Sequence, residues 1–245
     1  MFLIYANRWC YWVYRGDVMK TVKELQALLK SGKTSFEPLN IIESGMINDS
    51  KDTACEYMVV KGWDIGLAMQ CNDEWGAFNL DIMGVIENSP PEQEKELLGE
   101  SSLEDAHWNW LKKHQCYYGA QYDWFFFLVD EVPQGACLVY HPKEAISTNE
   151  NIFYIEFLAV APWNRPNIVT KQRFKGVGSK LLKHVMCYAE DSLGINKGFS
   201  LHSLPKAEGY YKKIGMIRFP QKDKDGLGYF EMPEKQRHDF LGVAS

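Results

Sequence analysis

Apolar runs of strand length alternate with amphipathic helical stretches along the second half of the chain. The runs are rich in β-branched and aromatic residues, which favour strands, and they lie at 123–129, 136–140, 152–160, 199–204 and 227–232. Helical spacing of apolar residues instead predicts helices over 179–193 and 207–214, the second ended by Gly215. From about residue 78, this alternation predicts one central sheet flanked by helices, of the α/β or mixed α+β class.

The first part of the chain has weaker patterns. Residues 20–31 have helical spacing and 33–54 are polar and mixed, which predicts a helix followed by a loop-rich segment. Strands are predicted at 56–60 and 78–86. After the break at Pro90 and Pro91, a capping-box pattern predicts a helix over 101–113. We therefore expect an N-terminal accessory region, 1–77, and a main domain, 78–245.

Bulk composition narrows the class of protein. The 245 residues are 46% hydrophobic and 24% charged, which is ordinary for a globular protein. No window approaches 18 uncharged apolar residues, and the apolar start MFLIYA is too short for a secretory signal, so no membrane span is expected. The six cysteines lack metal-ligand or CxxC spacing. They fit free thiols in a reducing cytoplasm and predict no metal site.

Charge is unevenly placed along the chain. The net charge is −5, which disfavours a general nucleic-acid binder. Residues 163–225, however, hold 13 Lys and Arg against 5 Asp and Glu, so the remainder is strongly acidic. This asymmetry predicts a local anionic ligand on the basic segment, with acidic surface elsewhere available to a cation.

The stretch QRFKGVGSKLL, residues 172–182, has two glycines before a helical stripe. It is not a Walker loop, because the lysine and hydroxyl after Gly178 are transposed, and it is not a dinucleotide fingerprint, because Leu181 replaces the third glycine. What remains is R-x-x-G-x-G, from Arg173 to Gly178. Backbone N–H groups at the start of a helix can bind an anion there, so this stretch is a candidate phosphate loop.

The order of motifs resembles the GNAT superfamily of N-acetyltransferases, in its bacterial type. The sequence LAV at 158–160 is followed by R-x-x-G-x-G, an amphipathic helix, a short strand and AEGYYKKIGM at 207–216. Tyr211, Gly215 and Met216 match the family's second motif. The resemblance covers roughly 78–232 and implies a twisted, mixed central sheet that binds acetyl-CoA, with no metal.

Two departures from the family stand out. Residues 161–172 insert twelve positions, two of them proline, between the strand and the arginine. Leu204 occupies a position that is often Asn in the family. The first departure affects the approach of an acceptor, and the second removes a polar contact to the cofactor.

The resemblance implies transfer of acetyl from acetyl-CoA to a primary amine in a ternary complex. The loop would hold the pyrophosphate, and main-chain groups of the central strand would polarise the thioester. The implied cofactor-binding residues are Leu158, Ala159, Val160, Arg173, Phe174, Lys175, Gly176, Val177, Gly178 and Ser179.

Two residues are candidates for proton transfer. Glu156 is a carboxylate inside an apolar strand, on the same face as Tyr154, Leu158 and Val160 by strand alternation. It is either the general base or a satisfied structural carboxylate. The resemblance makes Tyr211 the acid that protonates the leaving thiolate, with core packing as the alternative. Tyr210 would project to a different face.

The sequence gives only a general prediction of the chemical class of the acceptor and of the residues that bind it. Trp163 and Asn164 lie just beyond the strand, where an acceptor would approach, and are substrate-side candidates. The acidic remainder favours a small or peptidic cationic amine. His202 and the paired His107 and His114 lack ligand spacing and fit structural histidines. The rival reading is a sensor or partner-binding module that binds acyl-CoA without turnover, and a homodimer is left open.

Overall fold

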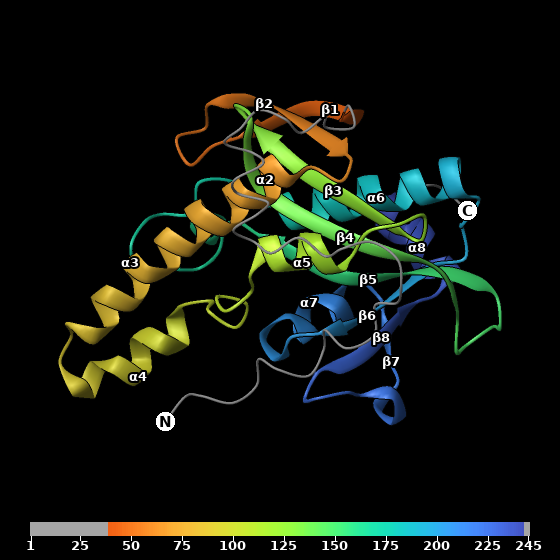
Figure 1. The fold of residues 1–245 in the computed structure, drawn as a ribbon. Helices are drawn as coiled ribbons and strands as arrows, with labels where there is room; N and C mark the ends of the chain where they lie inside the picture. Colours follow the sequence, from red (N-terminus) through yellow and green to blue (C-terminus); the bar gives the residue numbers. More distant parts are fainter. Residues whose placement is uncertain (1–38, 243–245) are drawn as a thin grey trace.

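An eight-stranded sheet forms the centre of the computed structural model, which describes residues 39–242 (Figure 1). The strand order is β1-β2-β3-β4-β5-β6-β8-β7. Every neighbouring pair is antiparallel except β5 and β6, which are parallel. The strands are β1 (Asn40–Asn48), β2 (Ala54–Lys61), β3 (Tyr122–Val129), β4 (Val132–Glu144), β5 (Asn151–Val160), β6 (Phe199–Ser203), β7 (Ile217–Arg218) and β8 (Gly228–Met232). The predicted mixed α+β class is confirmed.

Helices cover both faces of this sheet (Figure 1). They are α2 (Ile65–Gln70), α3 (Gly76–Glu87), α4 (Pro91–Glu100), α5 (Trp110–Cys116), α6 (Val177–Leu193), α7 (Glu208–Lys213) and α8 (Glu234–Leu241). A π-helical turn, Cys71–Trp75, joins α2 to α3. α6 packs against one face of β3, β4 and β5, whereas α2 and α5 lie on the opposite face.

The alternation along β3 explains why the sheet is covered on both sides. Phe125, Phe127 and Val129 belong to the core under α6. Trp124, Phe126 and Leu128 belong to the core under α2 and α5. Because successive strand side chains point to opposite faces, a continuous apolar run requires two cores, as this strand has.

The second half of the chain follows the predicted elements closely. β3, β5, α6, β6 and β8 each begin and end within two residues of their predicted bounds. The short β7 and the C-terminal α8 were not predicted. The predicted helix over 20–31 lies outside the described residues.

Residues 40–100 differ more from prediction. The loop-rich segment predicted over 33–54 contains β1, and the strand predicted at 78–86 is wrong, because α3 occupies it. Ile82 and Ile86 lie one helical turn apart and are both buried, so the run has a helical stripe. The helix predicted from 101 begins only at Trp110, where the Asn109 side chain accepts from the Lys112 N–H.

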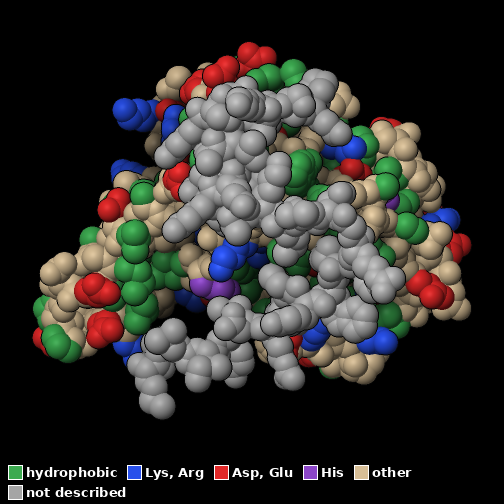
Figure 2. All heavy atoms as spheres, viewed as in Figure 1, with side chains coloured by type: hydrophobic (Ala, Val, Ile, Leu, Met, Phe, Trp, Pro, Cys, Tyr) green, Lys and Arg blue, Asp and Glu red, His purple; other side chains and the backbone are tan. Residues whose placement is uncertain are grey.

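The division predicted at residue 77 falls inside α3, and β1 and β2 are hydrogen-bonded in the same sheet as the rest. α3 and α4 form a hairpin that projects from the sheet, and hydrophobic and acidic side chains gather on it (Figure 2). Leu80 at its surface is 72% exposed, and no residue of α4 is buried.

Candidate acetyl-transfer site

β5 separates from β6 halfway along its length. Only Phe153, Tyr154 and Ile155 pair with β6, opposite Phe199, Ser200 and Leu201. The remaining residues, 156–160, are still part of β5 and pair with β4 alone. The sheet is thus open between β5 and β6 over the second half of β5.

A β-bulge at Glu156 marks the point of separation. Val139 of β4 faces Ile155, but the preceding Leu138 faces Phe157, so Glu156 is the extra residue on β5. A bulge bends its strand and changes which face the following side chains occupy. It therefore accounts for both the divergence and a change in side-chain alternation.

The predicted alternation along β5 is accordingly only half right. Glu156 shares its face with Tyr154, as predicted, because Ile155 and Phe153 are in the α6-side core. Leu158 and Val160 instead pack against the α6-side core, whereas Phe157 and Ala159 lie with the core under α5. The bulge reverses the alternation between Glu156 and Leu158.

The main chain beyond the bulge offers donors to the open side of β5. The Ala161 N–H points toward β4 and donates to the carbonyl of Gln134, a β4 residue, at 2.9 Å. Because N–H groups alternate in direction along a strand, those of Leu158 and Val160 point away from β4 and into the gap. This is the geometry expected of the residues predicted to polarise a thioester.

The N-terminus of α6 lies beside this gap. Gly176 caps the helix in the left-handed region, with φ of 77°, and no side chain caps the first N–H groups. Gly178 lies so close to Val160 of β5 that a Cβ there would stand 3.1 Å from Val160 Cγ2. Glycine at 178 therefore permits the contact between helix and strand, and the candidate phosphate loop lies next to the open half of β5.

The side chains of the predicted phosphate loop differ in their exposure to solvent. Arg173 and Lys175 are exposed, and the Arg173 guanidinium lies 3.8 Å from Asp130. Phe174 and Val177 are buried in the core and can contribute only main-chain groups. Ser179 Oγ lies 2.8 Å from the Tyr210 hydroxyl, which orients the first turn of α6.

Gln134, which the sequence did not single out, organises the loop before Arg173. Its Oε1 accepts from Trp163 Nε1 at 2.8 Å and from Asn164 Nδ2 at 2.9 Å. Asn164 Oδ1 in turn accepts from the Phe174 N–H at 2.9 Å. Asn164 is only 3% exposed, and through Gln134 the two substrate-side candidates are joined in the scaffold of the inserted segment.

Tyr211 is 7% exposed and lies in the α6-side core, with its ring 6.1 Å from that of Phe230. Burial raises the pKa of its phenol, so the group is protonated at neutral pH. Among the described residues, no side chain or carbonyl hydrogen-bonds its hydroxyl. Tyr210 points instead to Ser179, which agrees with the prediction that the two tyrosines face different ways.

Glu156 lies on the α5 face among lysines and aromatic rings. Burial raises the pKa of its carboxyl, while Lys143, Lys113 and Lys224 act in the opposite direction. Lys143 Nζ lies over the Tyr154 ring at 4.9 Å, and Lys113 Nζ lies over the Phe157 ring at 3.2 Å. The carboxyl is thus partly desolvated and surrounded by cations.

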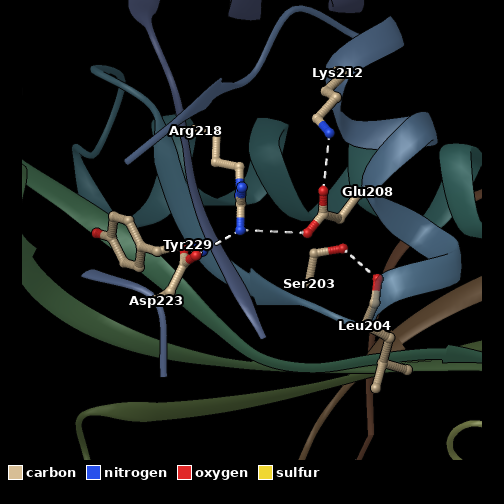
Figure 3. Close-up of polar contacts among 7 residues, drawn as sticks. All are labelled: Ser203, Leu204, Glu208, Lys212, Arg218, Asp223 and Tyr229. Carbon is tan, nitrogen blue, oxygen red and sulfur yellow. Dashed lines mark hydrogen bonds and ion pairs between the residues drawn. The ribbon is translucent and has the colours of Figure 1, made fainter. Parts of the chain in front are cut away.

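Leu204 follows β6 at the edge of a polar cluster (Figure 3). Its carbonyl accepts from Ser203 Oγ at 2.8 Å. Beside it, Glu208 accepts from Lys212 Nζ at 2.9 Å and lies 3.7 Å from Arg218, which also pairs with Asp223. Ion pairs therefore link the segments after β6, and the apolar Leu204 side chain points away from them (Figure 3).

A tyrosine–histidine pair at the point of separation was missed by sequence reasoning. The Tyr154 hydroxyl lies 2.6 Å from His202 Nδ1. His202 had been assigned a structural role, and 48 positions of sequence separate the two residues. The only available signal was that both lie on predicted strands of one sheet, whose order the sequence did not predict.

Within residues 39–242, no cluster of His, Cys, Asp and Glu has the arrangement of a metal site. In the same range, none of the helices has the length and apolar character needed to cross a membrane.

Comparison with known proteins gives similarity of fold. No family model matches the chain, and no curated protein matches its sequence. An uncharacterized protein from Bacillus halodurans is 13% identical, with a TM-score of 0.48 over 83% of this chain and 98% of that one. The GNAT domain of S. lividans PAT is 13% identical, with a TM-score of 0.43 over 78% of this chain and 96% of that one.

A third solved structure is a variant of the toxin AtaT, bound to the C-terminus of the antitoxin AtaR and acetyl-CoA. It is 17% identical, with a TM-score of 0.37 over 49% of this chain and 72% of that one. The mixed sheet expected from the sequence resemblance is present in this chain by its own strand order.

Proposed function

We propose that this protein is an acetyl-CoA-dependent N-acetyltransferase that acts on a primary amine. The observation that carries the proposal is the opening between β5 and β6 at the Glu156 bulge, next to the uncapped N-terminus of α6. An extended acyl thioester can lie along the free edge of β5 with its phosphates at the helix.

The cofactor-binding role belongs to main-chain groups. N–H groups from Gly176 to Ser179 would bind the pyrophosphate, because they lack partners within α6 and the helix dipole favours an anion. N–H groups of Leu158 and Val160 would donate to the thioester oxygen, where negative charge develops. Arg173 and Lys175 would add positive charge from the surface.

Two side chains would move protons. Glu156 would take a proton from the attacking ammonium, since burial brings the pKa of its carboxyl closer to that of a useful base. Tyr211 would protonate the leaving thiolate, because its hydroxyl has no other partner among the described residues. Glu156 lies on the α5 face of the sheet, and Tyr211 lies in the core on the α6 face.

The acceptor would be a primary amine on a small molecule or peptide. The overall acidity of the chain favoured a cationic acceptor, but Lys143, Lys113 and Lys224 all act on the Glu156 charge. This environment favours an acceptor with a single amino group over a polyamine. Trp163 and Asn164 have no place in this proposal, since they serve the inserted loop. The expectations against nucleic acid and for a cytoplasmic location remain predictions.

One experiment separates the enzyme from the acyl-CoA sensor. Acetyl-CoA binding is measured by calorimetry, and thiol release is followed against a panel of monoamines led by 2-phenylethylamine. Turnover that falls by about 10²-fold or more in Tyr211→Phe, with binding retained, supports the enzyme. Binding without turnover on any amine supports the sensor, and absence of binding overturns both.

A further inference from the structure

In the hydrogen bond between Tyr154 and His202, the donor and the acceptor can be assigned. His202 Nε2 lies 2.9 Å from the Lys222 carbonyl oxygen, which can only accept a hydrogen bond. Nε2 therefore carries the proton, and Nδ1 presents a lone pair. At 2.6 Å, that lone pair accepts from the Tyr154 hydroxyl, so the phenol donates to the imidazole.

The pair lies where the two strands begin to separate. Tyr154 belongs to the paired half of β5, and His202 is the first β6 residue beyond the last rung with β5. Tyr154 is half-buried and shares a face with Glu156, two residues along the strand. The phenol lies close enough to Glu156, the carboxylate that we assign to the acceptor, for the Glu156 charge to raise the pKa of the phenol.

The surroundings keep the imidazole neutral. Burial lowers the pKa of His202, and Lys143 and Lys224 lower it further. The hydrogen bond to Lys222 and the charge of Asp223 act against this shift but do not reverse it. The titratable and charged groups that face the ring are Tyr154 from β5, Lys143 from β4, Tyr229 from β8, and Lys222, Asp223 and Lys224 from the segment before β8.

Amide formation from an ammonium releases two protons from nitrogen. One compensates for protonation of the thiolate, and the other must leave the site. The first departs before attack and the second after nitrogen has bonded to the acetyl carbon, when the N–H has become far more acidic. A weakly basic neutral imidazole is suited to the second proton, because its pKa need not be high.

We propose that Tyr154 and His202 form the relay that accepts this second proton, an inference that rests on the proposed function. The N–H bond breaks, the proton goes to the Tyr154 oxygen, and the phenol's own proton moves to His202 Nδ1. The tyrosine ends neutral and His202 becomes an imidazolium that still donates to the Lys222 carbonyl. Solvent later removes the proton.

The test uses one variant that keeps a hydrogen-bond acceptor but cannot titrate, and one that removes the phenol. His202→Asn retains an acceptor near the Nδ1 position, and Tyr154→Phe removes the phenol. Each is expected to lower kcat by about 10²-fold, with the KM of acetyl-CoA and of 2-phenylethylamine nearly unchanged. The double variant should be no slower than either single variant, because the two residues act as a unit.

The pH profile separates a relay from a structural role. In the unaltered protein, kcat should fall as pH drops through a His202 pKa below the ordinary 6.5, since the imidazole must be neutral to accept. That limb should vanish in His202→Asn. Nitrogen NMR on the full chain should show His202 protonated at Nε2, independently of activity.

A matched control exists in the same chain. The Tyr57 hydroxyl lies 3.1 Å from His184 Nε2, in a second tyrosine–histidine pair remote from the β5–β6 gap. His184→Gln should leave kcat and its pH profile unchanged. Unaltered kcat and pH dependence in His202→Asn, or protonation at Nδ1 instead of Nε2, would overturn the relay. Failure of the unaltered protein to bind acetyl-CoA or turn over any amine would overturn the proposed function itself, and the relay with it.

Discussion

The two faces of the sheet differ in chemistry even though both are well covered. Under α6 the core is aliphatic and phenylalanine-rich, with Leu181, Leu182 and Val185 fully buried against the strands. Under α5 it is built from tryptophans and tyrosines, and lysine ammonium groups lie over several rings. The α5 face thus holds the charged surroundings of Glu156, whereas the core on the α6 face is mainly apolar and also contains the Tyr57–His184 and Ser179–Tyr210 hydrogen bonds. The difference teaches that Glu156, the proposed base, lies on the face with charged surroundings, while the N-terminus of α6, the proposed phosphate site, lies on the other face.

Leu181→Ala should have the largest effect, because it creates a cavity in the rigid face. Leu181 is fully buried between α6 and the sheet. We expect a loss of about 2–5 kcal/mol in the free energy of unfolding, measured by urea denaturation. Leu80→Ala, at a position 72% exposed, is the control and should change stability by less than about 0.5 kcal/mol. A cost below about 1 kcal/mol for Leu181→Ala would contradict tight packing on this face.

Glu156→Gln tests the polar face. We expect kcat for thiol release to fall by about 10²-fold, with acetyl-CoA binding retained. Because burial raises the pKa of the Glu156 carboxyl above 4.5, kcat of the unaltered protein should fall as pH drops through that raised value. The variant should lack this acid limb. Unchanged kcat would show that Glu156 is a structural carboxylate.

Gly178→Val addresses the contact between α6 and β5. A Cβ at this position already approaches Val160 within 3.1 Å, so the larger side chain must push the helix end away from the strand. The affinity for acetyl-CoA, measured by calorimetry, should fall by about tenfold or more. The matched control is Gly84→Val in α3, where a Cβ meets nothing within 4 Å. Equal affinities for both variants would argue against a phosphate role for this helix end.

Lys143→Met should have the smallest effect. Burial lowers the pKa of this lysine, so the folded state disfavours its charge. The variant should be slightly more stable at neutral pH, by less than about 0.5 kcal/mol. The unfolded state binds the lysine proton more tightly, so the unaltered protein should gain stability relative to the variant as pH rises toward 10.5. The exposed Lys213→Met should show no such trend in paired thermal melts.

The sequence was informative where a side-chain pattern depends on local periodicity. The apolar runs of β3 and β5 and the stripe of α6 gave elements within two residues of those observed. The strand predicted over 78–86 failed because a short, mostly apolar run does not distinguish a strand from a helix with a buried stripe. Only the packing of Ile82 and Ile86 decides between them.

The candidate site was predictable in its main-chain parts and less so in its side chains. Glycine spacing located the loop at 173–179, since such spacing reflects local backbone requirements. The assignment of Trp163 and Asn164 to the acceptor depended on their position along the chain and stays a prediction, and their hydrogen bonds to Gln134 could not be read from the sequence. The Tyr154–His202 pair needs the register of β5 on β6, which no single-sequence pattern encodes.

The bulge at Glu156 also makes the site unusually sensitive to chain length. Side chains along a strand alternate between the two faces, so one extra residue moves every later side chain to the opposite face. Deleting Glu156 would restore regular side-chain alternation and regular pairing with β4 along the whole of β5. It would therefore remove the cause of the bend. Loss of this one residue would then let β5 stay paired with β6 and close the opening between them. Most substitutions of Glu156 would keep the extra residue and leave the opening in place.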